Sequence, residues 1–287
     1  MPEMTVAAAP LARDRGRDRG GDHGPGRGRA AARRPARPAW PADCLTMAAR
    51  CARLASREID ALMTSLFLPV MLMVTFVYLF GGAISTGTRY VTYVVPGVLL
   101  LCAGVGSAST AVSVCRDMAG GIVDRFRAMD VGGLPVLSGH VAASAVRNAA
   151  ASAAVFAVAL GIGFRPHASL AGWAAVAGLL LLYVLAVSWL AAAVGLLLSA
   201  PEAAQAFMFV PMIVTYASSA FVPVRTMPVW LHGFASHQPA TPVIETLRGL
   251  LLGTHVGASG WQALAWCAGL CLGSAALATA AFRHRTR

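Results

Sequence analysis

Lysine is absent from this chain, because all 23 residues counted as lysine or arginine are arginines. A phosphate-binding loop of the GxxxxGK[ST] type needs the lysine ammonium on the β- and γ-phosphates of the nucleotide. The chain therefore cannot hold an ATP site of that kind. The HExxH and GxSxG patterns are missing as well, which excludes the zincin metal site and the nucleophile elbow of α/β-hydrolases.

Charge is also scarce. Only 12% of the 287 residues are charged, whereas 57% are hydrophobic, and the hydrophobic residues form uninterrupted runs long enough to cross a bilayer. An ordinary soluble domain does not have this composition. The sequence predicts an all-α integral membrane protein.

The hydrophobic runs predict six transmembrane helices, which are listed here by residue range: 62–82, 92–114, 144–163, 174–198, 203–222 and 261–281. Ionisable groups are almost absent from them: we expect Arg147 to snorkel toward the inner surface, and Glu202 falls in a short turn. Carriers coupled to ion gradients usually need intramembrane carboxylates or histidines. We therefore expect neither ion coupling, nor a catalytic residue, nor a metal site.

The arginines are distributed unequally between the two sides of the predicted membrane. Arg89, Arg165, Arg225 and Arg248 fall on one side and the other 19 on the opposite side. Because cytoplasmic segments carry the excess of positive charge, both termini are predicted to be cytoplasmic. Interfacial aromatics support the outer boundaries, namely Tyr90, Phe164, Trp173, Trp230 and Trp261. The Arg-, Ala- and Gly-rich composition indicates a bacterial cell membrane.

Residues 1–42 mix Arg, Gly and Pro without apolar periodicity, so they predict a disordered cytoplasmic tail ahead of a membrane domain at 43–287. Basic tails of membrane proteins commonly lie against anionic lipid, and nothing supports nucleic acid as a partner. Residues 44–60 place small apolar side chains on one face and Arg50, Arg53 and Arg57 on the other. This spacing predicts an interfacial helix.

The inner loop 115–130 departs from the pattern of short connections. A short helix beginning after Gly120 and Gly121 would place Ile122, Phe126 and Met129 on one face. Such an apolar ridge among fixed charges can dock into a groove on another protein. A solvated hairpin whose arginines only enforce topology is at least as compatible with this spacing.

The outer segment 223–259 is too apolar for a simple exposed loop. Thr241 as the cap and Pro242 at the first helical position predict the start of a helix, and Gly253 predicts its end. About a dozen residues cannot span the hydrocarbon, so we expect a re-entrant segment that dips into the outer leaflet or lies on it. Glu245 and Arg248 are spaced to pair. The segment is either a lid that seals the bundle or an exit gate.

Two sets of residues resemble the ABC-2 type permeases, in the branch that includes daunorubicin-resistance exporters. The first set lies on the inner side and comprises residues 121–129, 136–140, Arg147 and Asn148. The second is in the outer segment and comprises 218–223, Met227, Pro228, Trp230, Leu231, Pro239, Thr241, Pro242, Glu245 and 248–253. The resemblance covers about 62–281. His140 stands where arginine is common in the family.

The resemblance implies an ATP-driven exporter in which a separate ABC ATPase subunit binds ATP and Mg²⁺, while this chain binds no cofactor. The inner loop would be the coupling helix, with Asp124, Arg125 and Arg127 as polar contacts and Phe126, beside Ile122, as the apolar anchor. The outer gate would contain Phe221, Pro223, Pro228, Thr241, Glu245 and Arg248. Two permease subunits, identical or different, would enclose the substrate path.

The mostly uncharged spans favour a hydrophobic or amphipathic substrate, such as a drug, an antibiotic or a lipid-like metabolite. A permease for polysaccharide or lipid-linked glycan is an alternative, and aromatic residues on 203–222 do not exclude it. A membrane scaffold or enzyme that transports nothing is a further alternative. The presence of an ATPase in the purified complex would distinguish these classes.

Overall fold

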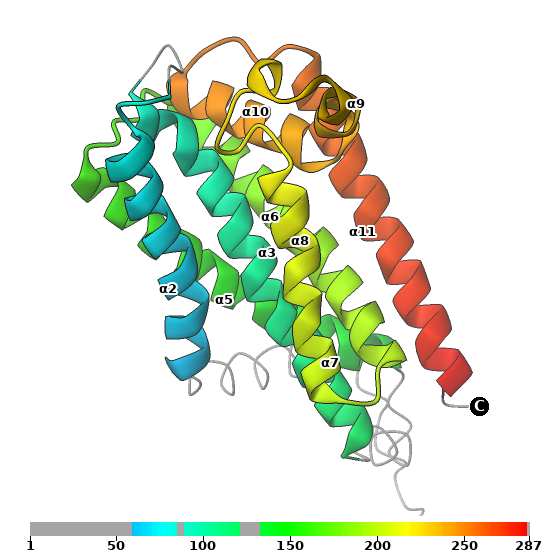
Figure 1. Cartoon of the computed structure of the whole chain (residues 1–287). Coiled ribbons are helices and arrows are strands. Elements are labelled where there is room, and N and C mark those ends of the chain that lie inside the picture. Colours follow the sequence, from blue (N-terminus) through cyan, green and yellow to red (C-terminus); the bar gives the residue numbers. More distant parts are fainter. Residues whose placement is uncertain (1–58, 85–88, 121–132, 286–287) are drawn as a thin grey trace, which may run out of the picture. The chain divides into compact units, whose positions relative to one another are not determined.

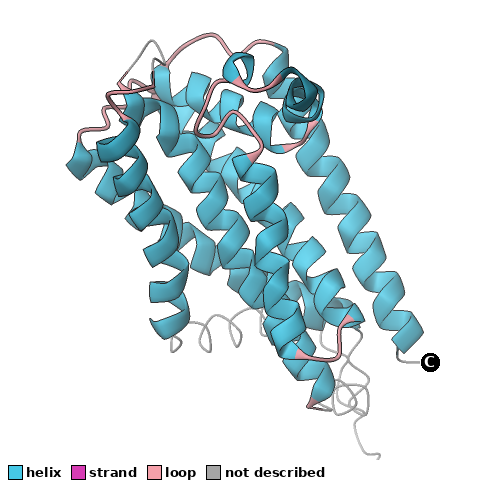
Figure 2. Cartoon of the chain, in the orientation of Figure 1, coloured by secondary structure: helices cyan, strands magenta, loops and turns pink. Residues whose placement is uncertain are grey.

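The computed structural model describes residues 59–84, 89–120 and 133–285. Helices make up every regular element in these ranges, as Figure 2 shows. This confirms the all-α prediction. The predicted tail at 1–42, nearly all of the predicted interfacial helix at 44–60 and the predicted coupling residues Ile122 to Arg127 lie outside the described residues, so these assignments stay predictions.

Four helices are long and apolar enough to cross a membrane: α3 (Tyr90–Ala119), α5 (Gly133–Ile162), α6 (Leu170–Leu197) and α11 (Ala258–Arg285). They correspond to the second, third, fourth and sixth predicted spans. Each has 28 or 30 residues, so it extends about 42–45 Å at 1.5 Å per residue. The third predicted span, 144–163, is too short, because α5 begins eleven residues earlier, at Gly133.

The first and fifth predicted spans each consist of several shorter helices. The first consists of α2 (Ile59–Thr75) and the π-helical η1 (Phe76–Phe80). The fifth consists of α7 (Pro201–Gln205), the 3₁₀ turn η2 (Ala206–Met208) and α8 (Phe209–Tyr216). The prediction of one continuous helix over 203–222 is wrong, because the chain leaves the helix after Tyr216.

The end of α8 has a local cause in its side chains. The Ser218 hydroxyl donates to the Thr215 carbonyl at 2.5 Å and accepts from the Ala220 amide at 3.2 Å. A serine that bonds nearby backbone groups in this way competes with the helical hydrogen-bond ladder. Pro223 then restricts the residue before it to extended conformations. Residues 217–222 are therefore a turn rather than a last turn of helix.

The centre of the bundle is α3, with 78% of its most apolar stretch buried inside the protein, against 28% for α5 and 22% for α11 (Figure 1). Close approach to α3 depends on glycine. A Cβ on Gly104 would lie 2.6 Å from the Pro211 Cβ of α8, and one on Gly97 would lie 2.6 Å from the Ala220 Cβ. Small residues of this kind allow membrane helices to pack backbone against backbone.

Three short helices cover one end of the bundle: η3 (Val224–Thr226), α9 (Val229–His237) and α10 (Ala240–Leu252). This end, called the α10 end below, also includes the start of α3 and the end of α5, and it lies away from the C-terminus (Figure 1). Tyr90 and Phe164, expected as interfacial aromatics here, are buried instead, at 4% and 0% exposure.

The prediction for α10 is partly correct. Thr241 is not its cap, since the helix begins at Ala240 with Pro239 before it. Gly253 ends the helix as predicted, with a left-handed φ of 68°. The Thr254 amide donates to the Gly249 carbonyl and the Gly253 amide to that of Leu250, which is a Schellman motif.

The expectation that this helix dips into the outer leaflet or lies on it stays a prediction. Within the protein, α10 packs against α3, α6 and α11. Its side chains at Val243, Ile244 and Leu247 are fully buried. The apolar side chains of α10 therefore form part of the protein core at this end.

Candidate functional site

The irregular turn at residues 217–222 is buried at the α10 end. Ser218, Ser219, Ala220 and Phe221 are exposed by at most 3%. Non-helical backbone at such a depth is tolerated only where its N–H and C=O groups find partners in the protein. The turn therefore depends on the helices around it.

Side chains from α3 and α10 supply these partners. The Thr241 hydroxyl accepts from the Ser219 amide at 3.4 Å, and the Tyr90 hydroxyl donates to the Phe221 carbonyl at 2.9 Å. The Thr241 hydroxyl in turn donates to the Ala235 carbonyl on α9. Thr241 is thus a link between α9, α10 and the buried turn, rather than the helix cap that its sequence position predicts.

Arg248 adds a charged donor to the turn and links it to α3. Its Nη2 donates to the Ser219 carbonyl at 2.8 Å and to the Tyr93 carbonyl at 3.1 Å. The guanidinium carbon lies 3.7 Å from the centroid of the Tyr93 ring, a cation–π distance. One planar group therefore joins α10, the start of α3 and the buried turn.

Glu245 completes the charge balance of this arginine. Its Oε1 lies 3.4 Å from Nη1 of Arg248, which confirms the pairing expected from their spacing. Among the described residues at the α10 end, Glu245 is the one carboxylate. Burial lowers the pKa of Arg248 from its ordinary value, and Tyr93 and Glu245 oppose that shift.

Phe221 packs the same turn against aromatic side chains of two other elements. Its ring centroid lies 4.6 Å from that of Phe76 on η1 and 5.2 Å from that of Tyr216 on α8. Aromatic pairs at such separations add to the stabilisation from buried area. The π-helical end of the first predicted span is therefore fixed to the turn by this cluster.

The structure brings together four of the six residues expected in the outer gate, which are Phe221, Thr241, Glu245 and Arg248. Pro223 and Pro228 lie at element junctions instead, where they precede η3 and α9. Sequence reasoning missed Tyr93 and Ser219 as partners of Arg248. Each contributes a backbone carbonyl, which every residue type has, and the Tyr93 ring contacts Arg248 only because the fold brings α3 and α10 together.

A second polar group lies deeper in the bundle, between α3, α5 and α6. The Ser188 hydroxyl is 3.3 Å from that of Ser107 and 2.8 Å from that of Ser144. Asn148 donates to the Ser144 carbonyl at 3.0 Å. A Cβ on Gly106 would lie only 2.2 Å from Oδ1 of Asn148, so glycine makes room for this amide.

Arg147 points into the bundle as well, which corrects the expectation that it snorkels to the surface. It is only 9% exposed, and its Nη2 donates to the Thr110 hydroxyl of α3 at 3.3 Å. An intramembrane arginine is costly unless it faces polar groups in the protein interior. Arg147 therefore belongs to the polar contacts between α3 and α5.

At the end of the bundle opposite α10, His140 and Asp117 connect α5 to α3. Nε2 of His140 lies 3.0 Å from Oδ2 of Asp117. These residues fall in the last turn of α3 and near the start of α5, so the pair joins the two helices that residues 120–132 connect. His140, which stands where arginine is common in the ABC-2 type permeases, thus makes a contact between two helices.

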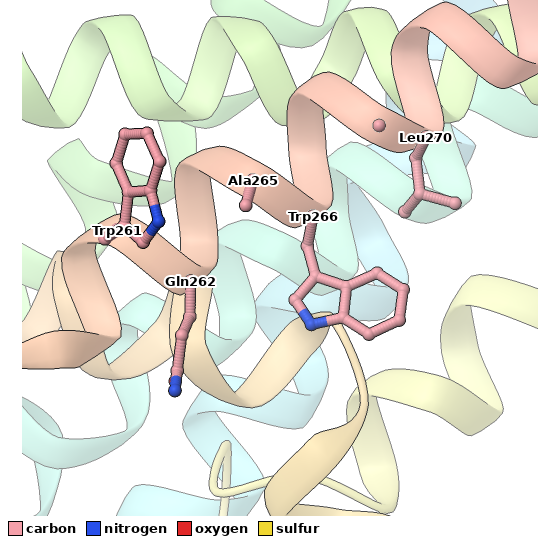
Figure 3. A pocket seen from close by; sticks show the side chains of 6 residues that line it. Trp261, Gln262, Ala265, Trp266 and Leu270 are labelled. Carbon is pink, nitrogen blue, oxygen red and sulfur yellow. The ribbon is translucent and has the colours of Figure 1, made fainter.

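Within the described ranges, no group of three or more His, Cys, Asp or Glu side chains could hold a metal ion. A hollow of about 610 Å³ lies on α11, lined by Trp261, Gln262, Ala265, Trp266, Gly269 and Leu270 (Figure 3). Gln262 and Trp266 project to the same side of the helix in this view. Because all six residues come from one helix, the hollow is a feature of its exposed face and not an enclosed chamber.

The sequence profile of the ABC-2 type transporters matches residues 42–252. The chain belongs to the ABC-2 type transporter family. The matched region contains the buried turn, Arg248 and all the transmembrane helices except α11. This ABC-2 family member is a multi-pass membrane protein, since several of its helices have the length and apolarity needed to cross a bilayer.

Curated relatives of similar sequence are permease proteins. The daunorubicin resistance ABC transporter permease protein DrrB1 of Streptomyces coeruleorubidus is 29% identical over 189 residues, which cover 65% of this chain and 67% of the relative. The "probable doxorubicin resistance ABC transporter permease protein DrrC" of Mycobacterium tuberculosis is 24% identical over 222 residues, which cover 76% and 79% of the two chains. These relatives confirm the resemblance to the daunorubicin-resistance branch.

Proposed function

We propose that this chain is the membrane-spanning subunit of an ATP-driven exporter and that a separate ABC ATPase subunit hydrolyses the ATP. The match of residues 42–252 to the ABC-2 type transporters carries the proposal. The missing lysine agrees with it, because a chain without a phosphate-binding lysine must obtain its energy elsewhere. ATP and Mg²⁺ would then bind only to the partner.

Six membrane crossings are part of the proposal. The 17-residue α2 and the five-residue η1 together extend about 30 Å, the thickness of the hydrocarbon core. The pieces α7, η2 and α8 extend about 25 Å, and the buried turn after them would complete the crossing inside the protein. The arginine asymmetry supports an orientation in which both termini would be cytoplasmic and the α10 end would lie outside the cell.

Residues 122–127 would dock into the ATPase, with Phe126 as the apolar anchor and Asp124, Arg125 and Arg127 as polar contacts. The His140–Asp117 contact supports this role, because it fixes the two helices from which the segment departs and to which it returns. Movement of the segment would then be transmitted to α3 and α5 together.

The buried turn and Arg248 would form the outer gate. The supporting observation is that one guanidinium holds α10, α3 and the turn at once, so a shift of α3 changes the position of the other two. Two permease subunits, identical or different, would enclose the substrate path. The substrate would be a hydrophobic or amphipathic drug, antibiotic or lipid-like metabolite, in line with the names of the curated relatives.

Affinity purification of the tagged chain from native membranes tests the proposal. We expect an ATPase subunit that carries the GxxxxGK[ST] motif to co-purify, and we expect the purified complex to hydrolyse ATP. The matched control is the same chain with Phe126→Ala, Arg125→Glu and Arg127→Glu, which should enter the membrane and lose the ATPase. Purification of the chain without any ATPase from native membranes would contradict the proposal.

A further inference from the structure

Two arginines meet at the end of α5, at a site that the exporter function does not use. The helix ends in a second Schellman motif: the Phe164 amide donates to the Ala159 carbonyl at 2.9 Å and the Gly163 amide to that of Leu160 at 3.1 Å. Gly163 has a left-handed φ of 107°. A Cβ on Gly163 would lie 3.2 Å from Nη2 of Arg89. The absence of a side chain at this position therefore leaves room for the Arg89 guanidinium.

Both guanidiniums rest on the same turn of backbone. Nη1 of Arg89 donates to the Gly163 carbonyl at 3.4 Å. Nη1 of Arg165 donates to the carbonyls of Leu160 and Phe164, each at 3.3 Å. A guanidinium has five N–H groups, and these bonds occupy Nη1 alone on each side chain. Arg89 and Arg165 are both exposed, so an anion outside the protein can reach them.

The charge of this pair is not neutralised within the described part of the protein. The two ion pairs in the described part of the protein join other residues: His140 with Asp117, and Arg248 with Glu245. Glu245, the one described carboxylate at the α10 end, is thus already paired. The carbonyl end of a helix carries a partial negative charge of about 0.5, which offsets only part of two full positive charges. The site therefore favours an anion.

Several apolar side chains within eight residues of Arg165 in the sequence are exposed. Leu160 is 39% exposed, Trp173 is 37% exposed, and Leu170 at the start of α6 is 88% exposed. The Trp173 ring packs edge-on against the ring of Phe156 on α5, with centroids 5.1 Å apart. This contact fixes the position of the Trp173 ring relative to α5. Most of α5 faces outward, because only 28% of its most apolar stretch is buried. An anion that also carries apolar chains could contact both the arginines and the exposed apolar side chains.

We propose that Arg89 and Arg165 bind the phosphate of an anionic phospholipid, whose acyl chains lie along the exposed face of α5. The planar fork of arginine matches phosphate oxygens in geometry and charge. Trp173 near the start of α6 agrees with a headgroup site, because tryptophan is enriched where the membrane meets water. The proposal does not depend on transport or on which side of the membrane the α10 end faces.

Native mass spectrometry of the full chain purified in detergent tests the site with dioleoylphosphatidylglycerol and dioleoylphosphatidylcholine as probes. We expect the wild type to prefer phosphatidylglycerol. Arg89→Gln with Arg165→Gln should weaken phosphatidylglycerol binding about fivefold for each arginine removed and leave phosphatidylcholine unchanged. Arg225→Gln is the matched control, since Arg225 is another exposed arginine of the α10 end, and it should keep the full preference.

Equal binding of the two lipids to the wild type would overturn the proposal, and so would an unchanged preference in the double variant. If inorganic phosphate at matched ionic strength displaces the lipid and binds as tightly alone, the site is one for free anions and the lipid proposal fails. Should the double Gln variant fail to fold, Arg165→Gln alone and Arg89→Lys with Arg165→Lys replace it. The first should weaken the preference, and the second should largely retain it.

Discussion

Removal of the Arg248 side chain is expected to destabilise the protein strongly for a polar residue. Arg248→Ala leaves the buried carbonyls of Ser219 and Tyr93 without their charged donor, and an unsatisfied buried group costs about 1–3 kcal/mol. We expect the free energy of unfolding to fall by about 3 kcal/mol. Equilibrium unfolding of the detergent-purified protein measures this change.

Two neighbouring variants serve as controls for that prediction. Arg225→Ala removes an exposed arginine and should change stability by less than about 0.5 kcal/mol. Glu245→Gln weakens an ion pair whose carboxylate is 47% exposed, and should cost less than about 1 kcal/mol. If all three variants lose the same stability, Arg248 does not have the special role described for it.

Single residues also show what the sequence could and could not predict. The spacing of Glu245 and Arg248 predicted their pair correctly, because residues three apart are neighbours on any helix. The burial of Arg147 and the partners of Arg248 depend on where other helices lie, and local spacing contains no such information. The residue type of Thr241 predicts a helix cap, whereas tertiary contacts determine its actual role.

Among the elements, the contact between α3 and α8 is governed by glycine. Gly104→Ala would place a methyl group 2.6 Å from the Pro211 Cβ, and overpacking of this kind costs about 1–3 kcal/mol. Gly269→Ala on α11 meets nothing within 4 Å, so the helix preference for alanine should stabilise it by up to about 1 kcal/mol. Thermal unfolding should therefore shift in opposite directions, and a common direction would refute this packing.

Contacts between elements also explain why the fifth predicted span is wrong. Hydropathy continues through residues 217–222, so the pattern alone predicts an unbroken helix. The break arises from the Ser218 hydroxyl and from donors on α3 and α10 that satisfy a non-helical turn. Four of the predicted spans coincide with long apolar helices, although α5 begins earlier than predicted, because apolar length is itself the property that membrane crossing requires.

The segment 122–127 yields a prediction for the coupling between subunits. Phe126→Ala, or charge reversal at Arg125 and Arg127, should reduce ATP-driven export at least tenfold while the chain still enters the membrane. The physical reason is the loss of the apolar anchor and its fixed charges at the ATPase. Export and substrate-stimulated ATP hydrolysis, measured in the same membranes, check this expectation. Unchanged values for both would exclude the coupling role.

For the whole molecule, the arginine distribution predicts the orientation in the membrane. In a cysteine-free variant, His255→Cys at the α10 end should react with a membrane-impermeant maleimide in intact cells. Arg287→Cys at the C-terminus should react only after the cells are opened. Labelling in the reverse order would show that the α10 end faces the cytoplasm and would remove the basis for an outer gate.

Transport by the reconstituted complex tests the central claim most directly. Proteoliposomes should contain this chain either alone or with its co-purified ATPase, and daunorubicin is a suitable fluorescent probe because a curated relative is named for resistance to it. We expect ATP-dependent movement of the probe only when both subunits are present, and none when the lysine of the ATPase phosphate-binding loop is changed to alanine. Pumping by this chain alone would contradict the account.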